Sequence, residues 1–204
     1  MRSCCGPSAG RGPRTSSPPC SRRSRGAARV RPRPRGGEPG ILVAVTEQYS
    51  ARTEAVRAAL VAAGHPDTVR HVPDGARTAA EAAAALGCEV GAIANSLVFL
   101  ADGAPLLVLS SGRHRVDTAG LAGRLGHDAI TRATPDDVVA ATGQVIGGVS
   151  PVGHPRPVVT VIDESLAEYP DLYAAAGTHD TIFRTDFAAL VALTGARIVT
   201  TSAA

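Results

Sequence analysis

Two apolar runs joined by a tight-turn signal limit the folds open to this chain more than any other feature. Residues 92–100 and 105–110 are apolar, and Asp102-Gly103 lies between them. Asp-Gly between apolar runs is typical of a two-residue hairpin turn, so the pattern predicts two adjacent antiparallel strands. Short helical and short strand patterns alternate along the rest of the chain. The hairpin therefore favours a mixed sheet over an all-parallel one, and we expect an α/β (mixed α+β) domain.

Capping residues and glycines mark where helices begin and end. Thr78 opens a capping box with Glu81, and residues 134–137 combine a cap, a first-turn proline and two first-turn acids. Glycine is the expected stop after the last turn of a helix. These signals predict helices at residues 50–63, 78–87, 117–126, 134–143 and 186–193. Apolar and β-branched runs predict further strands at residues 68–72, 157–162, 181–184 and 197–201.

The charge of the chain changes sign near residue 40. Residues 1–40 contain ten Arg, seven Pro and one acidic residue, which gives a net charge of +9, whereas residues 41–204 carry −6. A segment this polar and proline-rich cannot bury a core. We predict that residues 1–44 are a disordered Arg/Pro-rich extension or an upstream mis-assignment of the start, and that residues 45–204 are the folded domain. The alternative is a basic arm that supplies RNA affinity.

Cysteine and histidine usage argues against disulfides and metal sites. Three of the four cysteines lie in residues 1–40, which leaves Cys88 alone in the folded part, so no disulfide framework is expected. The six histidines form no His-x-x-x-His pair. No apolar run reaches the length of a membrane span. We expect a cytoplasmic protein with no metal, no cofactor and no membrane contact.

The Gly-Gly-Val-Ser-Pro-Val-Gly segment at residues 147–153 is the strongest candidate for chemistry. Three glycines leave the main chain bare, and Pro151 fixes one backbone angle. Such a loop can direct amide N–H groups at an oxyanion or a phosphate, although most loops of this composition are only turns. No Gly-x-Ser-x-Gly elbow surrounds Ser150, so its hydroxyl is not expected to act as a nucleophile.

Four motifs occur in a fixed order: the strand entry Val90–Phe99, the loop Gly147–Pro151, the strand end Val161–Asp163 and the turn Ala176-Gly177. Together they resemble the YbaK/EbsC family of aminoacyl-tRNA deacylases, also called prolyl-tRNA synthetase-associated editing domains. The resemblance covers about residues 65–202 and implies a curved, barrel-like mixed β-sheet with surrounding helices. It also implies hydrolysis of a mischarged aminoacyl-tRNA ester and contact with the acceptor end of the tRNA. An aminoacyl-tRNA synthetase is the second partner that it suggests.

The resemblance assigns roles to residues of the strand entry and the loop. The family's usual catalytic lysine falls at Asn95, and this chain contains no lysine. Asparagine donates and accepts hydrogen bonds but cannot protonate a leaving group. The predicted catalytic residues are Asn95, Gly147, Gly148, Ser150 and Pro151, with the amides of residues 147–150 as oxyanion donors. The side chain of Asn95 is expected to point toward the loop Gly147–Pro151. The predicted substrate-binding residues are Ser96, Arg113, Arg115, Gly153, His154 and His179.

Two functions remain open at this stage. The first is a deacylase that activates a water, or a group of the substrate itself, held partly by Asn95. The second is a non-catalytic module that binds an aminoacyl ester or another small ligand and has lost turnover with the lysine. The run Arg113-His114-Arg115 is either a phosphate-contacting patch or a solvated turn. Because the domain is acidic and has few aromatic residues, we expect any tRNA contact to be local.

Overall fold

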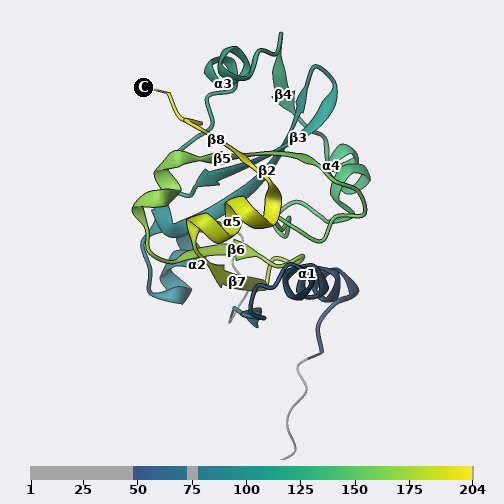
Figure 1. Cartoon of the computed structure of the whole chain (residues 1–204), viewed down its shortest axis with the longest axis vertical. Coiled ribbons are helices and arrows are strands. Elements are labelled where there is room, and N and C mark those ends of the chain that lie inside the picture. The colour runs from purple at the N-terminus through teal and green to yellow at the C-terminus, as the bar shows by residue number, and fades with distance from the viewer. Residues whose placement is uncertain (1–47, 73–77, 204) are drawn as a thin grey trace, which may run out of the picture. The chain divides into compact units, whose positions relative to one another are not determined.

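The computed structural model describes residues 48–72 and 78–203, which belong to one compact unit (Figure 1). The predicted extension at residues 1–44 lies outside the described residues. Helix α1 lies at one end of this unit and α3 at the other (Figure 1). None of the described helices is long and apolar enough to cross a membrane. The helices are α1 (Ala51–Ala62), α2 (Ala79–Leu86), α3 (Thr118–Leu125), α4 (Pro135–Thr142) and α5 (Phe187–Thr194), with short 3₁₀ helices η1 (Val90–Ala92) and η2 (Glu164–Glu168).

Side-chain caps start all five described α-helices where the sequence predicts them. Each N-cap side chain accepts a hydrogen bond from a main-chain N–H of the first turn, which satisfies one of the donors that a helix start leaves open. A glycine with positive φ follows each of α2 to α5. The predicted helix boundaries are confirmed to within one residue. The five N-caps are Ser50, Thr78, Asp117, Thr134 and Asp186.

Eight described strands form one mixed sheet, which confirms the predicted α/β class. The strand order is β1-β7-β6-β2-β3-β5-β8, and β4 pairs with the second edge of β2. Three neighbouring pairs are parallel: β2 with β6, β3 with β5, and β5 with β8. Strands β4 and β6 are not among the strands predicted from the sequence. The strands are β1 (Arg70–His71), β2 (Ile93–Ala101), β3 (Ala104–Ser111), β4 (Ile130–Arg132), β5 (Val159–Asp163), β6 (Leu172–Ala175), β7 (Thr181–Thr185) and β8 (Arg197–Val199).

The predicted hairpin is the centre of the sheet. Strands β2 and β3 pair along their lengths, and Asp102 and Gly103 make the turn with φ values of 48° and 83°. Positive φ at both positions is the geometry that matches the twist of the flanking strands. Leu107 packs in one core cluster and Val108 in the other. Strand β3 is therefore buried on both faces from Leu106 onward, which explains its nearly continuous apolar sequence.

Candidate functional site

The second edge of β2 is open in the middle. Strand β6 pairs with β2 at Ile93 and Ala94, and β4 pairs with it from Phe99 to Ala101. On that side, residues 95–98 have no neighbouring strand within the described chain. A gap inside a sheet leaves main-chain N–H and C=O groups that need another partner. Strands β4 and β6 thus frame an opening on β2.

Hydrogen bonds at the two ends of β2 show which groups face this opening. Gly112 N–H donates to Ile93 O at 2.8 Å on the β3 side, and Asp102 N–H donates to Ala129 O at 3.0 Å on the β4 side. The main-chain groups of a strand point to alternate sides. Odd-numbered residues of β2 therefore face β3, and even-numbered residues face the opening. The N–H and C=O of Ser96 are directed into it.

A pocket of about 440 Å³ occupies the opening. This volume lies within the range of small-molecule sites, roughly 300–1,000 Å³. Its walls come from β2, α2, β4, β6 and the loop that follows α4. Four residues predicted for the site line it: Asn95, Ser96, Gly147 and His179. Among the described residues, the lining includes Arg132 and no carboxylate, so the pocket favours a neutral or anionic group.

Asn95 and Ser96 lie on opposite faces of β2. Ala94 packs with Val149 of the glycine loop in one core cluster, whereas Ile93 packs with α2 in another. Successive side chains of a strand alternate between its faces. The Ser96 side chain is therefore on the face of β2 that packs toward the loop, and the Asn95 side chain is on the face that packs toward α2. We expected the Asn95 side chain to face the loop, and Ser96 occupies that position instead.

Two of the four amides expected to act as oxyanion donors are already used by the protein. Gly148 N–H donates to a carbonyl within its own turn at 3.0 Å, and Ser150 N–H donates to Gln144 Oε1 at 2.6 Å. The N–H groups of Gly147 and Val149 make no hydrogen bond to any described residue, and both residues line the pocket. Of the four amides predicted as donors, those of Gly147 and Val149 are therefore the two without a described partner.

Side chains hold the two peptide groups that flank Ser150. The buried Gln144 accepts from Ser150 N–H and directs its Nε2 to Val152 O at 3.4 Å. His154 Nε2 donates to Ser150 O at 2.8 Å. Burial lowers the pKa of His154 below its ordinary value, which favours the neutral ring. Ser150 is fully buried, and neither it nor His154 lines the pocket, so both support the loop.

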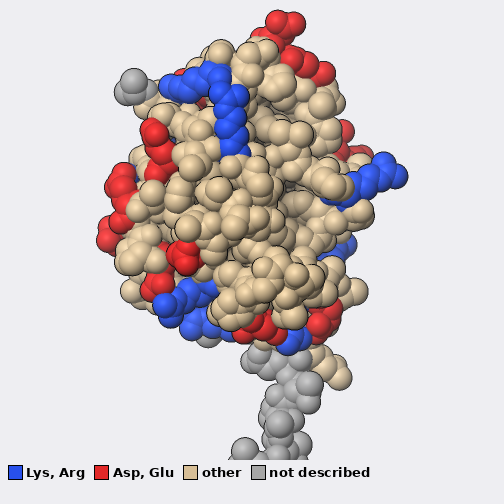
Figure 2. All heavy atoms as spheres, viewed as in Figure 1, with Lys and Arg blue, Asp and Glu red and all other residues tan. Residues whose placement is uncertain are grey.

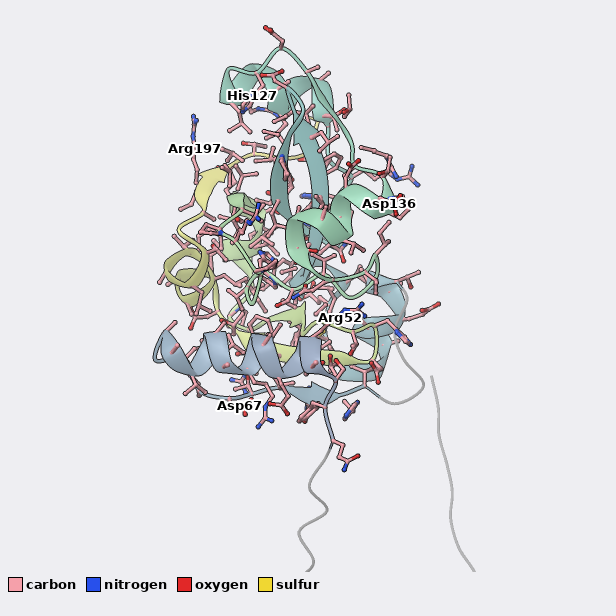
Figure 3. The ribbon with its side chains drawn as sticks, turned by 90° about the vertical axis from the view of Figure 1, so that its right-hand side faces the viewer. Arg52, Asp67, His127, Asp136 and Arg197 are labelled. Atoms are coloured by element: carbon pink, nitrogen blue, oxygen red, sulfur yellow. The ribbon has the colours of Figure 1, made fainter. Side chains whose placement is uncertain are left out.

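The end of the loop is packed on α1. A Cβ at Gly153, where φ is +81°, would lie 2.9 Å from Cα of Val56, so only glycine fits there. Arg52 of α1 donates from Nε to Gly143 O at 3.1 Å, beside the end of α4 (Figure 3). Pro151, which lies between Gly143 and Gly153 in the sequence, is buried. Pro151 and Gly153 therefore lie outside the pocket lining and have a structural role.

The start of the loop is packed on the turn at residues 176–179. A Cβ at Gly148 would lie 2.7 Å from Cα of Thr178, so the two segments touch through bare main chain. This contact brings together two motifs that are far apart in the sequence. His179 follows Thr178 and is exposed on the pocket wall. At Gly147 a Cβ would meet nothing within 4 Å, and the φ of +90° is what requires glycine.

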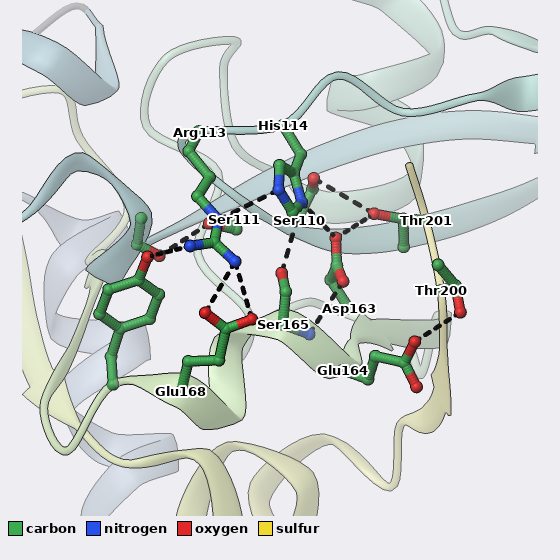
Figure 4. A network of polar contacts seen from close by, with 12 residues as sticks. Ser110, Ser111, Arg113, His114, Asp163, Glu164, Ser165, Glu168, Thr200 and Thr201 are labelled. Atoms are coloured by element: carbon green, nitrogen blue, oxygen red, sulfur yellow. Dashed lines mark hydrogen bonds and ion pairs between the residues drawn. The ribbon is translucent and has the colours of Figure 1, made fainter. Parts of the chain in front are cut away.

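The structure does not bring Arg113 or Arg115 to the pocket. Arg113 is paired with the Glu168 carboxylate at 2.7 and 2.8 Å and donates to Tyr169 Oη at 2.9 Å (Figure 4). Arg115 is exposed beyond this network. Neither arginine lines the pocket, so a role for them in holding substrate there is not supported. The ion pair instead fastens the end of β3 to η2.

A buried carboxylate in the same network also has a structural role. Asp163 ends the Val-Ile-Asp motif, is 1% exposed, and accepts hydrogen bonds from the Thr201 hydroxyl and from Ser165 N–H (Figure 4). Ser165 Oγ and Asp163 both approach Nδ1 of His114, at 3.4 and 3.7 Å, while Arg113 donates to Nε2. A Ser-His-Asp relay uses both ring nitrogens of the histidine, so these residues do not form one.

The arginine that lines the pocket, Arg132, is not among the residues predicted for the site. Arg132 is the last residue of β4 and is paired in register with Phe99 of β2. It is exposed, and its side chain makes no hydrogen bond, ion pair or ring contact with a described residue. On the face shown in Figure 2, basic and acidic groups are interspersed and no extended basic patch forms. On that face a polyanion would therefore meet separate positive groups and not a continuous basic surface.

Comparison with known proteins decides the family. The profile of the aminoacyl-tRNA editing domain matches residues 73–193. This chain belongs to that family. The resemblance drawn from the four sequence motifs is confirmed, and the matched segment contains the whole described pocket wall from α2 to β7.

Relatives of this editing-domain chain include parts of larger enzymes. The proline–tRNA ligase of Nitratidesulfovibrio vulgaris (strain DP4) is 30% identical over 173 residues, which are 81% of this chain and 30% of the ligase. The ligase of Levilactobacillus brevis is 27% identical over 69% of this chain and 25% of its own length. The chain thus spans less than a third of these ligases. A solved structure described as a candidate trans-editing enzyme for prolyl tRNA synthetase is 40% identical, with a TM-score of 0.72, over 77% of this chain and 100% of that one.

Proposed function

We propose that this editing domain hydrolyses the ester bond of a mischarged aminoacyl-tRNA. The observation that carries the proposal is the pocket on the open edge of β2. There the amides of Gly147 and Val149 have no hydrogen-bond partner among the described residues, and Asn95 lies on the opposite wall of the same pocket. Membership of the aminoacyl-tRNA editing domain family supplies the chemical class of the substrate.

The pocket provides groups for each requirement of ester hydrolysis except a strong acid. Water, or a hydroxyl of the substrate, attacks the ester carbonyl, and the carbonyl oxygen becomes an oxyanion. Free amides on the wall can donate to it, and one such donor is worth about 10²–10³ in rate. Asn95 can orient the nucleophile but cannot donate a proton to the leaving ribose hydroxyl. That proton comes from solvent or from the attacking group.

Arg132 is the group that we assign to the tRNA. It lies at the end of β4 on the pocket wall and has no described partner, so its guanidinium can contact a phosphate of the acceptor end. The volume of about 440 Å³ lies in the range of small-molecule sites and has room for an aminoacyl group. The likeness to proline–tRNA ligases and to the trans-editing protein makes proline tRNA the first candidate substrate.

One observation favours a second function. Asn95 stands where the family's usual lysine falls, and no lysine exists anywhere in the chain to replace it. A binding module that keeps the pocket without turnover would fit this substitution. It would take the same aminoacyl ester, or another small ligand, and leave it intact.

A deacylation panel separates the two functions. The full chain is incubated with proline tRNA charged with alanine, cysteine, serine or proline, and release of the amino acid is followed. We expect hydrolysis of at least one non-cognate ester and none of prolyl-tRNA. If the protein binds these tRNAs and releases no amino acid from any, the binding module is the correct function.

Replacement of Asn95 by lysine tests the role of that position. A lysine ammonium can supply the missing proton, and general acid catalysis typically contributes 10²–10⁴ in rate. We expect Asn95→Lys to raise kcat at least about 10-fold or to change which ester is hydrolysed. Asn95→Ala serves as the control and should lower kcat. A folded Asn95→Lys protein with unchanged rate and substrate range would show that this position takes no part in the mechanism.

A further inference from the structure

One buried hydroxyl on the pocket wall has no hydrogen-bond partner in the described part of the chain. Of the side-chain oxygens and nitrogens in the described residues, Ser96 Oγ is the one that is buried and makes no hydrogen bond. Two threonine hydroxyls on the same wall are paired with each other, since Oγ1 of Thr178 and Oγ1 of Thr181 lie 2.7 Å apart. Native proteins rarely leave a buried polar atom unpaired, and such an exception commonly marks a place where a ligand or water binds.

The position of Ser96 identifies what the hydroxyl would meet. Its main-chain N–H points into the opening of β2, and its side chain lies on the face that packs against Val149. The free amides of Gly147 and Val149 are on the wall of the same pocket. Hydrogen-bond donors from β2 and from the loop therefore approach one space from two directions. Because no described carboxylate lines this space, an acceptor oxygen fits it better than a cation.

We propose that the Ser96 hydroxyl donates a hydrogen bond to the carbonyl oxygen of the bound aminoacyl ester. This inference rests on the proposed function, since it places the ester in this pocket. The hydroxyl keeps its proton throughout, and the bond strengthens as negative charge develops on the carbonyl oxygen. Ser96 is then a catalytic residue that acts beside the loop amides, and the bond satisfies the hydroxyl that the protein leaves unpaired.

The first test compares two buried serines that differ in their partners. Ser96→Ala removes a hydroxyl without a protein partner, so we expect an unchanged or higher Tm together with a fall in kcat of about 10–10³-fold. Ser111→Ala is the matched control, because Ser111 Oγ donates to Gly91 O at 2.8 Å and lies outside the pocket lining. It should lower Tm and leave kcat/KM within about 2-fold. Equal kcat for Ser96→Ala and the wild type would overturn the proposal.

The second test needs no turnover. Proline tRNA ending in 3′-amino-3′-deoxyadenosine and charged with alanine carries a stable amide with the same carbonyl oxygen. We expect the full chain to bind it, and Ser96→Ala to bind it about 5–10-fold more weakly. Equal affinities, or no binding by the wild type, would overturn the proposal. Ser96-dependent binding by a protein that hydrolyses no ester would instead refute the proposed deacylase activity and retain the carbonyl contact.

Discussion

At the scale of single residues, the glycine loop contains two kinds of main-chain group. Some are hydrogen-bonded within the protein and hold the loop in shape, and others are available to a ligand. Ser150 is at its centre, yet its amide donates to Gln144 and its carbonyl accepts from His154. The two peptide groups on either side of Ser150 are thus each held by a side chain, which fixes the orientation of this part of the loop. The amides of Gly147 and Val149 are the ones left for a ligand. A rigid loop with few free donors suits a site whose donors must be in place before the reaction.

His154 makes the stability of this loop depend on pH. Its pKa in the folded state is lowered by burial, so the unfolded state binds a proton at a higher pH than the folded state does. The free energy of unfolding therefore increases as the pH rises toward about 6.5, the ordinary histidine pKa, and decreases as the pH falls below that value. One such group contributes a slope of at most about 1.4 kcal/mol per pH unit. Urea denaturation between pH 5 and 8 should show this slope in the wild type and a smaller one in His154→Gln. An identical slope in both proteins would assign the dependence to other groups.

At the scale of elements, the site is framed by the two strands that sequence patterns could not show. The hairpin of β2 and β3 has long apolar runs and an Asp-Gly turn, and its position was predicted correctly. Strand β4 is only Ile-Thr-Arg, and β6 is Leu-Tyr-Ala-Ala, which is too short and too rich in alanine to signal a strand. Both segments are strands because they pair with β2. The opening between them, and the place of Arg132 on it, could therefore not be foreseen, whereas Asn95 and Gly147 could be, from their motifs.

Because the loop contacts the turn at residues 176–179, glycine-to-alanine substitutions in the loop are expected to differ in their effects on stability and kcat. Gly148→Ala places a Cβ 2.7 Å from main-chain atoms of Thr178, so the loop must move. We expect a large loss of stability and a fall in kcat of about 10²-fold, the usual result of misplacing a catalytic group by about 1 Å. Gly147→Ala meets no atom within 4 Å but strains a φ of +90°, and should cost about 1–2 kcal/mol.

Gly123 of α3 is the control for this series. A Cβ there meets nothing within 4 Å and the backbone is helical, so Gly123→Ala should stabilise the protein by about 0.5–1 kcal/mol with normal activity. Urea denaturation and deacylation are measured on all three variants. If Gly148→Ala behaved like Gly123→Ala, the loop would not depend on its contact with the turn.

At the scale of the whole molecule, charge sets the way in which an RNA can bind. Residues 41–204 carry a net charge of −6, and residues 1–40 carry +9. An acidic domain repels the body of a tRNA, so attraction must be confined to sites such as the pocket wall at Arg132. Recognition of the acceptor end alone fits this distribution of charge. A partner that holds the rest of the tRNA, such as a synthetase, would then add affinity that the domain does not supply.

The salt dependence of tRNA binding tests whether contact is local. Each phosphate neutralised on a single strand contributes about −0.7 to the slope of log affinity against log salt. If Arg132 is the main phosphate contact, the slope is shallow, about −1, and Arg132→Gln reduces it by about 0.7. Deletion of residues 1–40 should then leave both slope and low-salt affinity unchanged. The ten arginines of that segment would give a much steeper slope if they bound RNA. A steep slope in the full chain that disappears on deletion would contradict local recognition and make the basic segment part of the function.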